Sequence, residues 1–127
     1  MLVDTSVWID AAEGADGNVV ERLASLVENG QACLCGPVLL ELRQGWSDRD
    51  VVALRFRLES LPYLTCPEAV WTRAGDIGST LRRRGRPVPS LDLIIATLAQ
   101  WHGTVVLTRD THFERIAEFT SVLVERI

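Results

Sequence analysis

The chain contains no lysine, since all 13 of its basic residues are arginine. This absence excludes every mechanism that depends on a lysine amine. Neither the lysine of a phosphate-binding loop nor a lysine that forms a Schiff base with a substrate can be present.

Cysteine is scarce, and long apolar runs are missing. Three cysteines, Cys33, Cys35 and Cys66, do not make a disulfide framework, and a reducing cytoplasm fits best. No second cysteine or histidine pair accompanies Cys33 and Cys35, so we interpret them as small buried apolar residues rather than metal ligands. No segment approaches the roughly 18 apolar residues that span a bilayer. The first residues, MLVDTSVW, lack the pattern of a secretion signal. We expect a cytoplasmic protein without a membrane segment.

Length and composition are those of one globular domain, which we expect to cover residues 1–127. Hydrophobic residues make up 47% of the chain, enough to build a buried core. The net charge of −4 argues against a surface coated in positive charge. It does not exclude nucleic acid as a partner, because local patches matter more than the total.

Strand-like and helix-like segments alternate along the sequence. Apolar runs typical of strands occupy residues 1–4, 32–35, 63–66, 104–107 and 122–124. Helical periodicity covers residues 7–12, 19–29, 37–42, 48–61, 67–84 and 91–101, and a further helix follows Asp110. This alternation predicts an α/β fold with a mostly parallel sheet.

Four carboxylates lie where these segments meet. Asp4 closes the first strand, and Asp110 follows the strand at 104–107. Glu41 lies in the first turns of the helix that leaves the second strand, and Asp92 begins the helix that leads into the strand at 104–107. The carboxyl ends of parallel strands open on one edge of a sheet, where ligands bind. We therefore expect all four acids in one crevice.

Four like charges in one crevice repel each other strongly. Two unit charges about 5 Å apart repel by roughly 3 kcal/mol at an effective dielectric constant near 20. A divalent cation relieves this repulsion at neutral pH, and a ligand set made of oxygen alone favours Mg²⁺ or Mn²⁺ over zinc. Such an ion can polarise a phosphodiester and lower the pKa of a water. The pattern thus favours hydrolysis of a phosphate backbone.

Each acid also has an ordinary structural explanation. Asp4 or Asp110 alone is typical of a helix cap, and Asp92 alone is a favourable charge in a first helical turn. Glu41 alone is typical of a solvated helix residue. The metal-site hypothesis therefore depends on the set of four and not on any single member.

The same residues fall within stretches that resemble a known family. V-D-T-S-V-W, P-V-L-L-E-L, P-S-L-D-L-I-I-A-T-L-A-Q-W-H-G and V-L-T-R-D-T-H-F occur in the order and spacing of PIN-domain ribonucleases, and most closely of VapC-type toxins from toxin–antitoxin pairs. The resemblance covers nearly the whole chain. It implies a three-layer α/β/α fold with about five parallel strands.

The resemblance also implies roles and partners. Asp4, Glu41, Asp92 and Asp110 would be the acidic quartet that binds Mg²⁺ or Mn²⁺ and cleaves RNA, and either Asp4 or Asp110 could orient the attacking water. Ser6 and Thr108 match polar positions that support the acids. A homodimer and an inhibitory antitoxin are implied as partners. Some family members carry another acid two residues after the Asp110 position, where this chain has His112; we expect a structural or exposed role for this histidine, although a catalytic one is open.

Four arginines, Arg82, Arg83, Arg84 and Arg86, cluster just before the Asp92 helix. They could be a solvated helix end, where positive charge is favourable. They could also grip RNA phosphates, for which the arginine fork is suited, or contact an acidic segment of the antitoxin.

The expected helix at 48–61 carries apolar residues on two faces. A helix packed on one core needs a single apolar stripe, so the second can be a partner surface or part of a fully buried helix. The candidate contacts with the antitoxin or a second copy are Trp46, Leu54, Phe56 and Leu58. Three other tryptophans, Trp8, Trp71 and Trp101, we expect in the core.

Two other functional classes compete with the nuclease. A PIN fold that binds RNA or protein without cutting would be indicated by loss of an acid, and none of the four is lost. A phosphorelay receiver needs a lysine that the chain lacks, and an Asp-x-Asp phosphatase needs an acid where Ser6 stands. Metal-dependent RNA cleavage is the function that the sequence favours.

Overall fold

The computed structural model describes residues 1–14, 16–45 and 57–127. Within these residues, strands and helices alternate as the sequence predicted. The strands are β1 (Leu2–Val3), β2 (Leu34–Cys35), β3 (Tyr63–Leu64), β4 (Val105–Thr108) and β5 (Leu123–Arg126). The helices are α1 (Thr5–Glu13), α2 (Gly17–Glu28), α3 (Gly36–Gly45), α5 (Glu68–Arg83), α6 (Ser90–Trp101) and α7 (His112–Ala117).

All strand pairs are parallel, and they form two ladders. One ladder has the order β1-β4-β5 and the other pairs β2 with β3. A single parallel bridge between Leu2 and Cys33 joins them, supported by a 2.9 Å bond from the Cys33 amide to the Met1 carbonyl. The α/β class is confirmed, but the continuous sheet contains three strands instead of the expected five. Strands β1 and β2 are two residues long and each runs almost directly into a helix, which leaves little length for a ladder between them.

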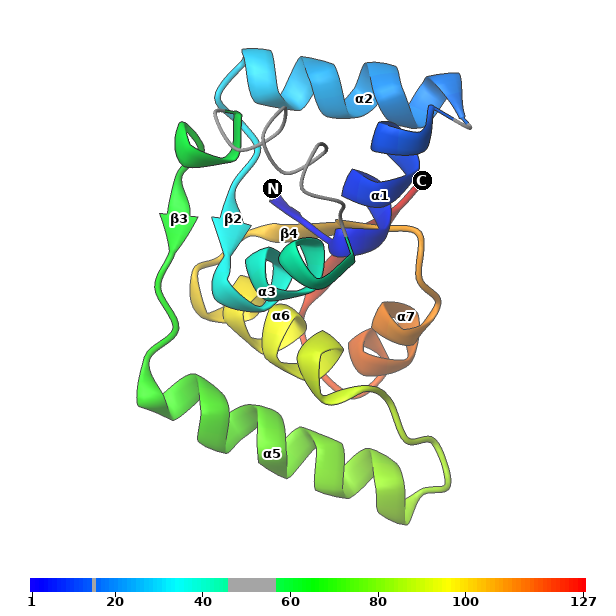
Figure 1. The fold of residues 1–127 in the computed structure, drawn as a ribbon. Coiled ribbons are helices and arrows are strands. Elements are labelled where there is room, and N and C mark those ends of the chain that lie inside the picture. Colours follow the sequence, from blue (N-terminus) through cyan, green and yellow to red (C-terminus); the bar gives the residue numbers. More distant parts are fainter. Residues whose placement is uncertain (15, 46–56) are drawn as a thin grey trace.

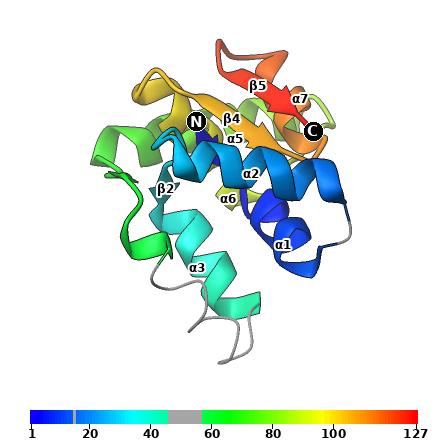
Figure 2. The same ribbon diagram turned by 90° about the horizontal axis from the view of Figure 1, so that it is seen from above.

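Helices flank the sheet on both sides. Helix α2 lies on one side of β4, while α6 and then α5 lie on the other, as both views show (Figure 1 and Figure 2). Helix α5 packs on α6, which packs on β4, and α1 contacts α2. None of the described helices is long and apolar enough to cross a membrane.

Strand β4 is central to the core. Val106 and Leu107 are fully buried, as expected for a parallel strand covered on both faces, and Phe113 of α7 is buried beside this core. In the register with β1, Leu107 stands opposite Val3, so the carboxyl ends of the two strands lie side by side. This pairing brings residues that are about a hundred positions apart in sequence to one point.

Two expectations about apolar residues fare differently. Trp8 is buried as predicted, but Trp71 and Trp101 are 53% and 54% exposed, so their assignment to the core is wrong. Trp71 lies on α5 and Trp101 is the last residue of α6, and the apolar character of a tryptophan alone did not show that these positions are open to solvent.

Only part of the predicted partner surface lies within the described residues. Trp46, Leu54 and Phe56, with most of the helix expected at 48–61, lie outside the described residues. Leu58 is buried in the core of its own chain, which leaves little of its side chain for contact with a partner.

The close approach of α5 to α6 gives a test of the packing. A Cβ placed on Gly78 would lie 2.6 Å from Cδ1 of Leu93, whereas one on Gly75 of the same helix meets nothing within 4 Å. Gly78→Val should therefore lower the free energy of unfolding by about 1–3 kcal/mol more than Gly75→Val, because both change helix propensity equally and only the first crowds α6. Urea unfolding of the two variants measures the difference, and equal stabilities would contradict this packing.

Candidate functional site

Asp4 follows β1 directly and is held at the end of the sheet. Its amide donates to the Leu107 carbonyl of β4 at 2.9 Å. Its side chain caps α1, and Oδ2 accepts hydrogen bonds from the Ser6 hydroxyl at 2.5 Å and the Thr108 hydroxyl at 2.8 Å. The residue is buried. Asp4 is thus both the helix cap that it could have been alone and an anchored carboxylate at the carboxyl end of β1.

Thr108, the last residue of β4, connects two of the acids. Its hydroxyl donates to Asp4 and accepts from the Asp110 amide at 2.9 Å. The Ser6 hydroxyl accepts from the Arg109 amide at 3.1 Å. Ser6 and Thr108 therefore lie where the resemblance implied, between the acids and the backbone that carries them.

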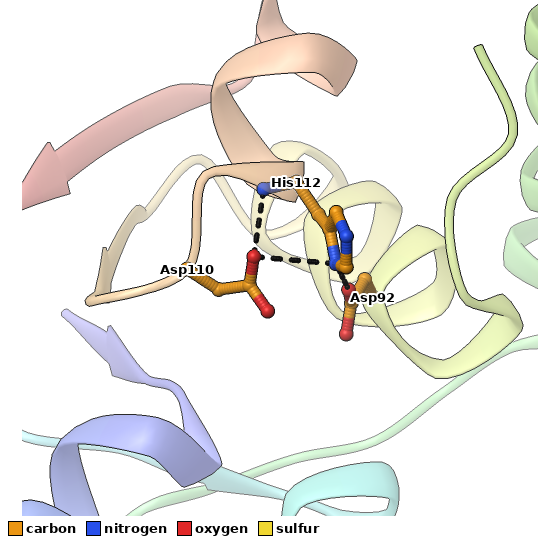
Figure 3. Close-up of side chains that lie close together, drawn as sticks. All are labelled: Asp92, Asp110 and His112. Atoms are coloured by element: carbon orange, nitrogen blue, oxygen red, sulfur yellow. Dashed lines mark hydrogen bonds and ion pairs between the residues drawn. The ribbon is translucent and has the colours of Figure 1, made fainter.

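Asp92, Asp110 and His112 form a close group of possible metal ligands (Figure 3). Nδ1 of His112 lies 2.9 Å from Oδ2 of Asp92 and 3.2 Å from Oδ1 of Asp110. One ligand atom from each of the three residues lies within 4.8 Å of the other two. Asp92 comes from the first turn of α6, and His112 begins α7, so the start of each helix points at the same place.

The pKa of the Asp92 carboxyl is raised to about 6 from its ordinary 3.8. Burial is the main cause, and the negative charges of Asp4 and Asp110 add to it, while the hydrogen bond from His112 opposes it. The first turn of a helix would favour the ionised form, so burial and the neighbouring acids outweigh the helix dipole here. The charge of Asp92 at neutral pH is therefore unfavourable in the protein as it stands.

Glu41 reaches the same region from α3. Its Oε2 accepts a 2.5 Å hydrogen bond from the hydroxyl of Thr5, the residue next to Asp4. Glu41 is half-buried. The structure thus places the four acids at one end of the sheet, with Asp4 and Asp110 joined through Thr108, Asp92 and Asp110 through His112, and Glu41 through Thr5.

Arg109 was not singled out by sequence, yet it fixes the segment between Thr108 and Asp110. Its guanidinium lies 2.6 Å from Oδ2 of Asp10 on α1 and 3.0 Å from Oδ2 of Asp16, the cap of α2. The hydrogen bond from Arg109 lowers the pKa of the exposed Asp16 carboxyl. These ion pairs tie the end of β4 to both N-terminal helices.

The arginine cluster lies at the end of α5, and three of its members have partners within the chain. Arg83 donates to the hydroxyls of Ser79 and Thr80. The Arg84 guanidinium lies 4.7 Å from the centre of the Phe119 ring, and Arg86 pairs with Glu118 near the same ring. Arg82 is exposed at the last turn of the helix. The predicted contact of these arginines with RNA stays a prediction.

The role of His112 had been left open by the sequence. We expected a structural or exposed role, and the structure puts its ring between two of the four acids. The signal was available in the spacing, because a residue two positions after Asp110 begins the next helix on the same edge of the sheet.

The donors at this site suit a divalent cation. Asp92 and Asp110 offer carboxylate oxygens close together, and the charges of Asp4 and Asp110 add to the burial that raises the pKa of Asp92, so a cation would favour its ionised form. Burial raises the pKa of Cys35 to about 12 and also raises those of Cys33 and Cys66. This agrees with our interpretation of Cys33 and Cys35 as small buried residues.

Comparisons with known proteins agree with this arrangement. The model of the PIN domain family matches residues 1–119. Ribonuclease VapC21 of Mycobacterium tuberculosis is 39% identical over 113 residues, which cover 84% of this chain and 80% of that protein. Ribonuclease VapC11 of the same species is 33% identical over 127 residues, covering 96% and 95%. The structure of DNA-bound VapBC from Salmonella typhimurium has a TM-score of 0.81 at 26% identity, covering 98% of this chain and 96% of that chain.

The raised pKa of Asp92 predicts a stability effect with a definite pH dependence. Between pH 3.8 and about 6 the folded protein holds a proton that the unfolded chain releases, so stability falls as the pH rises through this window. Asp92→Asn should therefore raise the free energy of unfolding of the metal-free protein at neutral pH by about 1–3 kcal/mol, with the gain shrinking as the pH falls toward 4.

Urea unfolding in a chelating buffer across this pH range measures the gain. Asp76→Asn, on the exposed side of α5, is the matched control and should change stability little at any pH. A loss of stability in Asp92→Asn at neutral pH would contradict the electrostatic assignment.

Proposed function

This chain belongs to the PIN domain family, and from that membership we propose that it is a metal-dependent endoribonuclease, the toxin of a toxin–antitoxin pair that inhibits translation. The observation that carries the proposal is the meeting of four carboxylates at the end of β1 and β4, in a chain whose relatives VapC21 and VapC11 are named ribonucleases. We propose that it acts in the cytoplasm, as the composition suggested.

Asp4, Glu41, Asp92 and Asp110 would hold Mg²⁺ or Mn²⁺, since the set is rich in carboxylate oxygen. When bound, such a cation polarises the scissile phosphate and stabilises the charge that develops on it. Thr108 and Ser6 keep Asp4 oriented through their hydroxyls, a supporting role that commonly affects metal affinity by about 10–100-fold.

The exposures of the aspartates suggest which one orients the attacking water. Asp4 is buried, and its Oδ2 already accepts hydrogen bonds from Ser6 and Thr108. The Asp110 side chain is 37% exposed, against 12% for Asp92. We therefore assign water orientation to Asp110, an assignment that the sequence had left open between Asp4 and Asp110.

A non-catalytic PIN-fold module that binds RNA or protein is the alternative function. It is not favoured, because each of the four acids is present and the sheet end that carries them has its supporting hydroxyls in place. An inhibitory antitoxin and a second copy of the chain remain the protein partners that we propose, in keeping with the pairing of toxin and antitoxin that the family resemblance implies.

Removing one acid should stop cleavage while leaving the fold intact. Asp4→Asn or Asp92→Asn should lower the rate of RNA cleavage by at least about a thousandfold, because each change removes a ligand and a charge from the site. Excess chelator should have the same effect on the wild type, and added Mg²⁺ or Mn²⁺ should restore activity. Gel analysis of a defined RNA measures the rate.

Asp76→Asn again serves as the control and should cleave at the wild-type rate, and circular dichroism shows whether each variant is folded. Full activity of the wild type in chelator would refute metal dependence. Cleavage by Asp92→Asn at the wild-type rate would refute the site.

The arginines at the end of α5 give a separate test of RNA binding. Arg82→Ala combined with Arg83→Ala should weaken binding of single-stranded RNA and lower the slope of log affinity against log salt by about 1–1.5, as expected for two lost phosphate contacts. We choose this pair because Arg84 and Arg86 pack on Phe119 and Glu118. Arg73→Ala, earlier on the same helix, is the control, and an unchanged salt slope in the double variant would remove Arg82 and Arg83 from the RNA surface.

A further inference from the structure

We infer that His112 supplies its Nδ1 as a nitrogen ligand to the cation held by Asp92 and Asp110, and that this nitrogen shifts the preference of the site from Mg²⁺ toward Mn²⁺. The inference rests on the metal site of the proposed function and goes beyond it, because that proposal uses oxygen ligands alone. It assigns a task to the nitrogen donor in the group formed by Asp92, Asp110 and His112.

The position of the His112 ring is fixed from two directions. Its backbone amide donates to Oδ1 of Asp110 at 2.8 Å, which sets the start of α7 against that carboxylate. Its Nδ1 then lies 2.9 Å from Asp92 and 3.2 Å from Asp110, as Figure 3 shows. The nitrogen is therefore already directed at the two carboxylates between which a cation would lie.

An ion that enters this group meets the nitrogen as well as the oxygens. The three donor atoms lie within 4.8 Å of one another, a spacing that one cation can bridge after small side-chain movements. A neutral imidazole can then exchange its hydrogen bond to a carboxylate for a bond to the ion. The His112 ring would therefore keep nearly the same position whether its Nδ1 bonds to a carboxylate or to the ion.

The opposite arrangement would make His112 an internal counter-ion that competes with the metal. Charge favours the ligand role. Four carboxylates meet at this end of the sheet, and an imidazolium carries a single positive charge. The guanidinium of Arg109, the residue before Asp110, is paired with Asp10 and Asp16. A divalent ion therefore neutralises more of the acidic charge than the ring could.

The type of ligand atom sets the metal preference. Mg²⁺ is a hard ion that takes oxygen ligands and keeps several waters. Imidazole suits the divalent transition ions, whose affinity for nitrogen sites exceeds that of Mg²⁺. Family members with an acid at this position offer one more oxygen, whereas this chain offers nitrogen, so its metal preference should differ from theirs.

The direct experiment is pulsed electron paramagnetic resonance of bound Mn²⁺, which detects magnetic coupling to a ligand nitrogen. The chain has two histidines, His102 and His112. His102 lies at the other end of α6, with its Nε2 2.9 Å from the Thr65 carbonyl. His102→Ala therefore leaves His112 as the sole histidine, and labelling that variant with nitrogen-15 histidine identifies the ligand without altering His112. We expect nitrogen coupling that changes with the label.

Calorimetric titration of Mn²⁺ and Mg²⁺ gives the second readout. His112→Ala should lower Mn²⁺ affinity by about tenfold or more with a smaller loss for Mg²⁺, and His112→Asp should recover Mg²⁺ affinity without recovering the preference for Mn²⁺. His102→Ala is the control and should retain both affinities.

The outcomes separate this inference from the proposed function. Bound Mn²⁺ without nitrogen coupling, or tighter Mn²⁺ binding by His112→Ala, overturns the ligand role and would mark His112 as an internal counter-ion. Failure of the wild type to bind either ion, with no difference from Asp92→Asn, overturns the metal site itself.

Discussion

Repulsion between carboxylates at the carboxyl ends of β1 and β4 is the constraint around which this end of the protein is built. Asp4, Asp92 and Asp110 are brought together by strand pairing and by the start of α6, although their charges oppose the contact. Neighbouring polar groups reduce this repulsion. The hydroxyls of Ser6 and Thr108 donate hydrogen bonds to Asp4, and the ring of His112 lies between Asp92 and Asp110. The pKa of Asp92 is nevertheless raised to about 6, mainly by burial and in addition by the charges of Asp4 and Asp110, so a divalent cation would stabilise its ionised form.

Much of the site could be predicted because topology alone determines where a strand ends. Asp4 and Asp110 follow strands that pair in parallel, so their meeting required only the correct identification of two apolar runs. Asp92 and Glu41 could be placed because a helix between parallel strands begins at the same edge. The four strand-helix boundaries that matter for the acids lie in short, strongly apolar segments, where sequence patterns are most informative.

What escaped prediction depends on distances that periodicity does not encode. His112 is two residues from Asp110, but its role follows from a 2.9 Å approach to Asp92, twenty positions earlier in the chain. Arg109 forms ion pairs with Asp10 of α1 and Asp16 at the start of α2, and no feature of the neighbouring sequence predicts these contacts. Trp71 and Trp101 were assigned to the core by residue type, yet each is more than half exposed. The continuous sheet has three strands and not five because β1 and β2 are only two residues long, and hydrogen bonding between such short strands depends on small backbone shifts.

The pairing of β1 with β4 also has a consequence for how the protein is made. Asp4 precedes its hydroxyl partner Thr108 by 104 positions, so the two residues are synthesised far apart in time. Until β4 pairs with β1, a growing chain cannot bring Asp4 and Asp110 together. The group of acids therefore forms only late in the synthesis of the segment that carries it.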